Sequence, residues 1–309
     1  MTSMKCSCRR RTSRLAGSGK NMTRNLTRIS RLVFALAMTP GMAPASAADA
    51  PLSIPTPVIV RVVAYHAMAL GDNVGGARVT IRDAGTGAVL ASGRQTGPSG
   101  DAKVIMQTPH LQAEAVYSVR ESASFTAELQ LTQPTLVEIV GEGPLQFPHA
   151  MRRASKMMLI YPGKAVTGDG IILELDGLLV TIEAPTAERP LGIGDEGTVS
   201  TTVKMLCGCV IEPFGIWESR KMDLYGELRL GEKVIQRIDM YHQAKGLFTG
   251  NFKIPRSLKG EKSISLRVVA ADAEDVNVGF DEVTYPLVPW EQSRDATGRE
   301  IPATATPKP

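Results

Sequence analysis

Short apolar runs recur from residue 58 onward, and clusters of Gly, Pro, Asn and Asp separate them. Side chains on a strand alternate between its two faces, so short alternating or β-branched runs predict strands and not helices. The first half of the chain contains seven such runs: Val58–Tyr65, Ala77–Asp83, Val89–Thr96, Lys103–Thr108, Val116–Arg120, Glu128–Leu131 and Leu136–Val140. The second half contains six: Val199–Leu206, Met222–Leu230, Lys233–Met240, Phe248–Ile254, Ser263–Ala270 and Val283–Val288. The pattern predicts an all-β protein made of sandwiches.

The segment between these halves carries two further signals. Ile171–Leu175 and Leu178–Ile182 flank Asp176-Gly177, and Asp-Gly favours the tight turn of an antiparallel pair. We therefore predict a β-hairpin there. Separately, we predict a short helix over Phe147–Met158. The expected organisation is one β-sandwich over residues 51–145, a hairpin-bearing connector over 146–186, and a second sandwich over 187–290. The polar tail, residues 291–309, is rich in Ala, Thr and Pro and is expected to be disordered.

The N-terminus has the three parts of a secretory signal. Arg24, Arg28 and Arg31 precede a short apolar stretch, Leu32–Met38, and Ala45-Ser46-Ala47 offers small residues to a signal peptidase. The apolar stretch is much shorter than the roughly 20 residues that span a bilayer, and no other segment is long enough. We expect residues 1–47 to be a cleaved signal peptide, starting at Met1 or at Met22, and the mature protein to be periplasmic or secreted without a transmembrane segment.

Removing this leader reverses the net charge. The whole chain has 35 Lys and Arg against 31 Asp and Glu, a net charge of +4. Nine of the basic residues and none of the acidic ones precede residue 32, which leaves 26 basic against 31 acidic residues, or −5. A mildly acidic chain with 5% aromatic residues does not predict nucleic acid or an anionic membrane as a partner.

Two resemblances accompany this pattern. The first rests on a "GA-x-V" strand, a "G-x-V-L" strand and a Gly turn, at Val74–Ile81, Thr86–Leu90 and Gly97–Gly100. This set resembles the transthyretin-like or carboxypeptidase-regulatory-like sandwich modules. The second, at Val269–Asp272, Asn277–Gly279 and Val283–Tyr285, is similar to the closing strands of bacterial immunoglobulin-like domains. The resemblances imply roles in binding, spacing or assembly, and they carry no catalytic residues across.

Cys207-Gly208-Cys209 is the strongest candidate for chemistry, since it holds the only cysteines after the predicted leader. An exported protein meets an oxidising compartment, where neighbouring thiols tend to react. On a regular strand their Cα atoms would lie about 6.5–7 Å apart, at the limit of disulfide reach, and Gly208 permits the bend that a bridge needs. A local disulfide is one hypothesis, and a thiolate pair for copper or zinc is another. Redox exchange or an intermolecular disulfide is a third.

Three further residues would strengthen a metal site. Met205 shares a strand face with the two cysteines, and Met240 and His242 share a face on another predicted strand. Together they would give copper thiolate, thioether and imidazole ligands. The sequence does not place the two strands side by side, and methionine at such positions commonly packs in a core.

The sequence contains no enzyme motif that its surrounding residues support. Gly192–Gly197 matches G-x-G-x-x-G, but Asp195 and Glu196 would repel a pyrophosphate and a strand follows. His66, His110 and His149 lack ligand spacing, and Trp217 is either a core anchor or an exposed contact for a partner. We expect a non-enzymatic accessory or binding protein that engages a protein or envelope component. The alternatives are a metal-handling protein that uses Cys207 and Cys209, and an enzyme with a dispersed site.

Overall fold

Strands dominate the part of the chain that the structure describes. The computed structural model describes residues 52–111, 114–119, 121–289 and 292, and those residues contain eighteen strands and five short helical turns. The all-β prediction is therefore confirmed. The predicted signal peptide and the predicted disordered tail lie outside the described residues, apart from residue 292.

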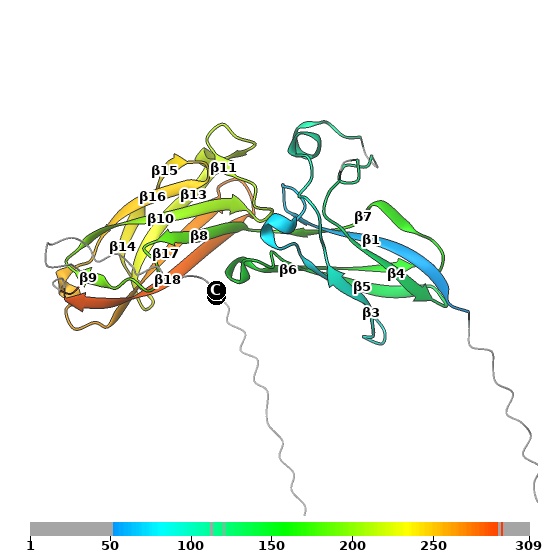
Figure 1. Ribbon diagram of the computed structural model, residues 1–309, viewed down its shortest axis with the longest axis horizontal. Helices are drawn as coiled ribbons and strands as arrows, with labels where there is room; N and C mark the ends of the chain where they lie inside the picture. The colour runs from blue at the N-terminus through cyan, green and yellow to red at the C-terminus, as the bar shows by residue number, and fades with distance from the viewer. Residues whose placement is uncertain (1–51, 112–113, 120, 290–291, 293–309) are drawn as a thin grey trace, which may run out of the picture. The chain divides into compact units, whose positions relative to one another are not determined.

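Seven strands form the first pair of sheets (Figure 1). They are β1 (Ile54–Ala64), β2 (Arg78–Asp83), β3 (Val89–Arg94), β4 (Phe125–Leu131), β5 (Thr135–Gly143), β6 (Arg152–Ile160) and β7 (Val166–Leu175). One sheet has the order β4-β1-β7 and the other β3-β2-β5-β6. All pairs in these sheets are antiparallel except β1 with β7, which runs parallel.

The second pair of sheets takes most of the remaining strands. They are β8 (Leu178–Ala184), β9 (Leu191–Ile193), β10 (Glu196–Met205), β13 (Met222–Leu230), β14 (Lys233–Asp239), β15 (Tyr241–Ala244), β16 (Leu247–Lys253), β17 (Ser263–Asp272) and β18 (Val278–Pro289). Their orders are β15-β16-β10-β8 and β14-β13-β17-β18-β9. If the strands are lettered along the chain, β8 is A, β9 is A′, β10 is B, β13 is C, β14 is C′, β15 is D, β16 is E, β17 is F and β18 is G. The two sheets then have the orders D-E-B-A and C′-C-F-G-A′, which are those of an immunoglobulin-like sandwich. The disulfide that joins the B and F strands of antibody domains has no counterpart, because β10 and β17 contain no Cys.

Five helical turns and a two-stranded ribbon complete the described elements. The turns are η1 (Asp72–Val74), η2 (Lys103–Gln107), η3 (Pro148–Ala150), η4 (Ser219–Lys221) and η5 (Arg256–Leu258). The ribbon pairs β11 (Ile211–Glu212) with β12 (Trp217–Glu218) in parallel. No helix among the described residues is long and apolar enough to cross a membrane.

Alternating burial along the strands produces the core. Every second residue of β10 from Val199 to Met205 is buried, and the residues between them are partly exposed. β1 is buried on both faces from Val60 to Ala64, which agrees with its nearly continuous β-branched sequence and its central place in its sheet. One cluster of buried apolar residues extends from the first pair of sheets into the second.

The predicted hairpin is not formed. β7 pairs with β1 in the first pair of sheets, whereas β8 pairs with β10 in the second. The chain passes from one sandwich to the other at Asp176-Gly177, where Gly177 has a φ of +137° and donates its N–H to Asn277 Oδ1 at 2.8 Å. Residues 146–186 therefore contribute strands to both sandwiches instead of forming a separate connector.

Three other predicted elements are corrected. Lys103–Thr108 contains the π-helical turn η2, because the Asp101 carboxylate accepts the N–H groups of Lys103 and Val104. The described part of Val116–Arg120 is not a strand, since its N–H groups at Val116 and Ser118 bond to the Asp169 carboxylate. Phe147–Met158 contains η3 and most of β6, where the partly buried residues Arg152, Ala154 and Met158 all fall at even positions, as on one face of a strand.

Candidate functional site

Loops from both sandwiches meet where the chain crosses between them. We call residues 65–74, 206–221 and 273–277 the junction loops. They follow β1, link β10 to β13, and link β17 to β18, respectively. Hydrogen bonds join the three segments to one another, and the second of them contains both cysteines.

A disulfide joins Cys207 to Cys209, whose Cα atoms are 5.4 Å apart. The chain turns sharply after β10, and Gly208 occupies the left-handed region with a φ of +79°. The turn is closed by Gly208 N–H donating to Met205 O at 2.8 Å and Met205 N–H donating to Cys209 O at 3.0 Å. This bend shortens the separation expected on a regular strand, and it matches the hypothesis of a local disulfide.

The disulfide turn also contacts the first sandwich. Cys207 is fully buried, and its carbonyl oxygen accepts hydrogen bonds from Asn73 Nδ2 at 2.9 Å and from Ser99 Oγ at 3.4 Å. A Cβ added at Gly208 would lie against Asn73 and Val74. The turn is thus part of the contact between the two sandwiches.

The structure does not bring the proposed metal ligands together. Met205 is buried opposite Leu178 of β8, whereas His242 is exposed on the edge strand β15. Between them lies β16, whose Phe248 faces His242 on one side and Thr201 of β10 on the other. Met205 is four residues beyond Thr201, about 13 Å along the strand.

Met240 and the two cysteines do not complete a metal site either. Met240 sits where the chain leaves β14 for β15, which belongs to the opposite sheet. The described residues include no group of three or more His, Cys, Asp or Glu that could hold a metal ion. Cys207 and Cys209 in a disulfide offer no thiolate. Copper or zinc binding remains a prediction without geometric support from Met205, Met240 or His242.

His66 and Trp217 tie two of the junction loops together. Trp217 Nε1 donates to His66 O at 3.0 Å. The His66 ring stacks on Tyr65 with 4.0 Å between centroids, and its Nδ1 lies 2.6 Å from Asp275 Oδ2. Trp217 is half-buried and packs against the apolar core, and its N–H is bonded across the junction, so it is not a free contact for a partner.

Phe214 stands at the tip of the loop between β11 and β12. It is 82% exposed, and the guanidinium of Arg220 lies 4.0 Å from its ring centroid. Its N–H donates to Glu218 Oε2 at 2.8 Å, and Arg220 Nη2 donates to the same oxygen at 2.8 Å. The hydrogen bond from the Arg220 side chain is the largest cause that lowers the pKa of Glu218 to about 2. Glu218 therefore stays ionised and holds the tip in one conformation.

The two non-glycine residues with positive φ in the described chain both lie in the junction loops. His66 has a φ of +51° and Phe214 a φ of +61°. Such conformations cost on the order of 1–3 kcal/mol and persist where surrounding contacts impose them. The sequence analysis did not single out Phe214, although an aromatic residue between Pro213 and Gly215 is a signal for an exposed turn.

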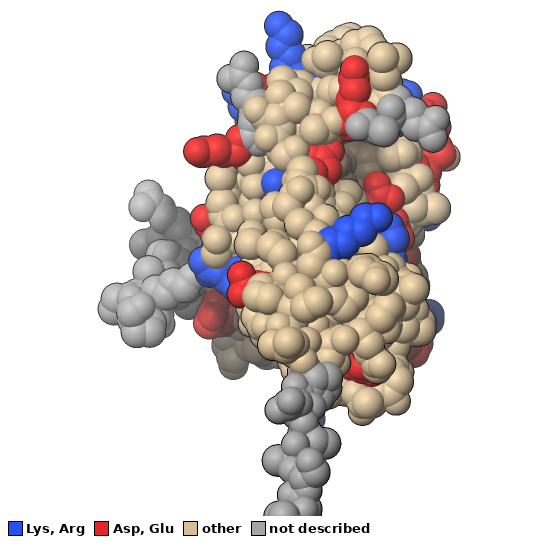
Figure 2. Space-filling model, turned by 90° about the vertical axis from the view of Figure 1, so that its right-hand side faces the viewer, with Lys and Arg blue, Asp and Glu red and all other residues tan. Residues whose placement is uncertain are grey.

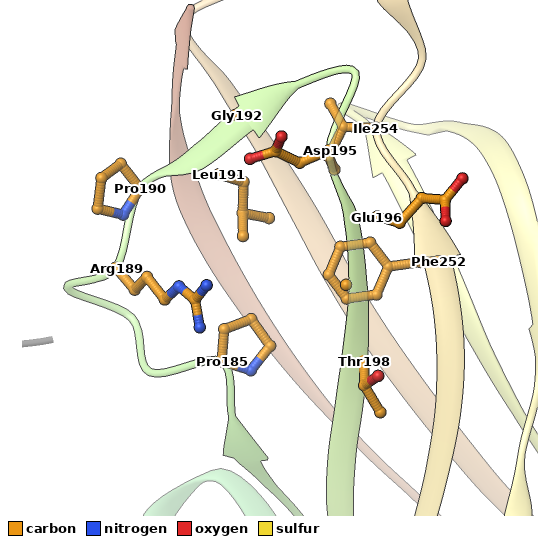
Figure 3. Close-up of a pocket in the computed structure, with 11 residues that line it drawn as sticks. Pro185, Arg189, Pro190, Leu191, Gly192, Asp195, Glu196, Thr198, Phe252 and Ile254 are labelled. Carbon is orange, nitrogen blue, oxygen red and sulfur yellow. The ribbon is translucent and has the colours of Figure 1, made fainter. Parts of the chain in front are cut away.

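A pocket of about 270 Å³ lies at β9, outside the junction loops (Figure 3). Pro185, Arg189 and Pro190 form one wall, and Phe252 and Ile254 of the β16 end form another. The rejected G-x-G-x-x-G segment runs along it, and β10 follows as the sequence predicted. Glu196 at its rim is paired with Lys253 at 2.8 Å. The lining residues include the carboxylates of Asp195 and Glu196 and the hydroxyl of Thr198, but no Ser, Cys, His or Lys.

Comparisons with known proteins identify no family. No family model matches the chain, and no curated protein matches it. Among solved structures, a fragment of the ICAM-5 ectodomain comprising D1–D4 matches with 13% sequence identity and a TM-score of 0.25. The match covers 74% of this chain and about half, 51%, of that one. A score this low carries no argument about function, so the immunoglobulin-like order of the second pair of sheets rests on the strand pairing alone.

Proposed function

We propose that this protein is an exported, non-enzymatic accessory protein that binds a protein partner or envelope component through its junction loops. The observation that carries the proposal is that the Phe214 ring is exposed at the tip of a fixed loop. An aromatic ring that is 82% exposed is held in a strained backbone conformation by Glu218 and Arg220.

The chemistry of this tip is that of a binding hot spot. Aromatic residues and arginine dominate the energetics of protein interfaces, and Phe214 lies directly beneath the Arg220 guanidinium. Ile216, on the same loop, is 42% exposed. The loop is fixed at its base by Trp217 and the disulfide turn, so little conformational freedom would be lost on binding.

Export rests on the sequence of residues 1–47, and the disulfide gives it independent support. Disulfides persist in oxidising compartments and are rare in the cytosol, so Cys207–Cys209 fits a periplasmic or secreted location. The pocket at β9 has carboxylates at Asp195 and Glu196, of which Glu196 is paired with Lys253 at 2.8 Å, and we assign it no catalytic role.

Site-specific photo-crosslinking in the native host tests this proposal. A photo-reactive residue at position 214 of the full chain should give one dominant adduct, whose partner is identified by mass spectrometry. Purified partner should then bind Phe214→Ala at least about tenfold more weakly, which corresponds to ~1.4 kcal/mol. The matched control is Phe280→Ala, which removes another exposed ring that lies under an arginine, Arg267 at 5.2 Å. Unchanged affinity for Phe214→Ala, or an equal loss for Phe280→Ala, would contradict the proposal.

The metal-handling alternative is separated by composition. Mature protein purified without chelator should contain no copper or zinc, and its intact mass should rise by two hydrogens on reduction. Opening so short a loop should lower the free energy of unfolding by about 1–2 kcal/mol, measured by urea titration with and without reductant. Near-stoichiometric metal that is lost in Cys207→Ser would instead support the metal hypothesis.

A further inference from the structure

β6 is a long strand at the edge of its sheet. It pairs with β5 on one side, and no described strand pairs with its other side. It has nine residues, whereas the common length is about five or six. Its free N–H and C=O groups can therefore receive another strand, which most edge strands avoid by being short or covered.

The outer face of β6 is apolar in its second half. Met157, Leu159 and Tyr161, the residue just after the strand, alternate on this face and are 59%, 63% and 62% exposed. Leu136, which pairs with Leu159 from β5, is 46% exposed. These four residues form a continuous apolar surface along the open edge. Figure 2 shows one face of the molecule, the right-hand side of Figure 1, and Lys, Arg, Asp and Glu are sparse on the lower half of that face.

The first half of β6 is cationic. Residues 147–168 contain Arg152, Arg153, Lys156 and Lys164 and no acidic residue, although the chain after residue 47 is acidic. Among the described residues, no ion pair involves Arg153, Lys156 or Lys164. Glu142, which faces Arg153 from β5, is already paired with Arg78 at 3.2 Å. A partner at this edge would therefore meet uncompensated positive charge.

The charge of Lys156 makes a second copy of the chain an unfavourable partner for the edge of β6. Lys156 is in register with the buried Ile139 of β5, although its own side chain is exposed, and a charge on an edge strand opposes pairing with any strand that lacks the opposite charge. Two β6 strands would also bring two sets of cations together, and like charges across a strand pair are destabilising. The charge pattern favours an acidic occupant.

We propose that β6 accepts an antiparallel strand from a partner protein, a segment whose first half is apolar and whose second half is acidic. In this orientation the apolar half lies along Met157, Leu159 and Tyr161. Acidic side chains on the two faces of the other half meet Arg153 on the outer face and Lys156 on the inner face. Main-chain hydrogen bonds supply affinity and the alternate side chains supply specificity. This surface is separate from the junction loops, so the proposal does not depend on the function proposed above.

Two synthetic peptides about ten residues long test the proposal against the full mature protein. In the first, alternating Val and Thr precede consecutive Asp residues, which place carboxylates on both faces of the strand, and in the second, Lys replaces each Asp. Fluorescence anisotropy should show the acidic peptide binding at least tenfold more tightly, with an affinity that falls as salt rises. Hydrogen exchange should slow at β6 amides when the peptide binds. Equal binding of both peptides, or no binding at about 1 mM of the acidic one, would overturn the proposal.

Variants of exposed residues identify the surface. Leu159→Lys should weaken the acidic peptide at least tenfold, whereas Val234→Lys should not. Val234 is the matched control, since it is an apolar residue, 42% exposed, on the edge strand β14. The double variant Arg153→Glu, Lys156→Glu should reverse the preference to the basic peptide. Circular dichroism checks that each variant folds.

Two other outcomes would point elsewhere. A dimer in sedimentation that Leu159→Lys dissociates would make a second copy the occupant and overturn the proposed partner. Phe214→Ala should leave peptide binding unchanged. If it abolishes binding, the peptide occupies the junction loops, and the assignment to β6 fails while the proposed function gains support.

Discussion

At the scale of single residues, buried polar side chains form hydrogen bonds with backbone groups. Arg61 is 6% exposed, and its guanidinium donates to the carbonyl oxygens of Gly168 and Asp169 at 2.7 and 2.8 Å. Burial lowers the pKa of Arg61, and the nearby Asp169 carboxylate opposes that shift. Such contacts join segments more than a hundred residues apart, so they fix where a loop meets a sheet.

Gln95 is the clearest case for a test. It is fully buried just after β3, where it accepts from Val62 N–H at 2.7 Å and donates to Val62 O at 2.8 Å and Leu70 O at 2.9 Å. Gln95→Leu would keep the apolar volume but leave Val62 N–H and Leu70 O unpaired, whereas Val62 O would still accept the Leu70 N–H at 3.0 Å. Each unsatisfied buried group costs about 1–3 kcal/mol, so we expect a loss of at least about 2 kcal/mol in the free energy of unfolding.

Urea unfolding measures this loss directly. The control is Gln130→Leu on β4, where the same change affects an exposed side chain that bonds to other exposed side chains, and we expect a change within about 0.5 kcal/mol. A similar result for both variants would mean that the Gln95 hydrogen bonds contribute nothing specific.

At the scale of elements, the sequence predicted strands well where one face is buried. Met222–Leu230 was predicted with the same bounds as β13, and Ser263–Ala270 with the same start as β17, because their apolar alternation reflects a face that packs on the core. Lys103–Thr108 has a similar apolar content, but Asp101 caps it as a π-helical turn. The hydrophobic periodicity of the segment does not reveal that the Asp101 side chain binds backbone N–H groups that a strand would use to pair with its neighbour.

Pairing was harder to predict than strand location. Asp176-Gly177 has the residues of a hairpin turn, yet the chain uses it to cross between sandwiches, because β1 and β10 offer longer-range partners to β7 and β8. The candidate site shows the same limit. The local disulfide could be predicted from Cys207 and Cys209 with Gly208 between them, whereas the contact of Cys207 O with Asn73 depends on residues 134 positions apart.

Close packing between β8 and β18 gives a prediction at this scale. A Cβ added at Gly279 of β18 would collide with the backbone carbonyl and Cβ of Leu178, and neither backbone can move without disturbing its sheet. Overpacking of this kind costs typically 1–3 kcal/mol and occasionally more, so Gly279→Ala should lower stability by about 3 kcal/mol in thermal or urea unfolding. Gly85→Ala is the control, since its Cβ would meet only Asp83 Oδ1 at 3.4 Å. Equal stability of the two variants would contradict this packing.

At the scale of the whole molecule, the described residues from Leu52 to Pro289 form one unit in spite of containing two sandwiches. The apolar core cluster runs through both, and polar contacts outside the junction loops add to it. His149 and the carbonyl of Val180 lie 2.9 Å apart, and Arg152 Nη2 donates to Val278 O at 3.3 Å. We therefore expect the two sandwiches to unfold together.

Asn277 is the residue that tests this coupling. It is 1% exposed, its Oδ1 accepts Gly177 N–H at the crossing point, and its Nδ2 donates to Tyr65 O of the first sandwich at 3.4 Å. Asn277→Ala would leave the Gly177 N–H buried and unpaired, at a cost of about 1–3 kcal/mol. Because that bond joins the sandwiches, the loss should fall on their coupling as well as on total stability.

Differential scanning calorimetry distinguishes the two effects. The parent protein should show one transition whose calorimetric and van't Hoff enthalpies agree, and Asn277→Ala should show a ratio above one as the sandwiches begin to unfold separately. Asn251→Ala, which removes an exposed bond between Thr198 and Asn251 within the second sandwich, should keep the single transition. If Asn277→Ala lowers the melting temperature but preserves the ratio, the apolar core alone couples the sandwiches, and the junction loops are then free to serve a partner.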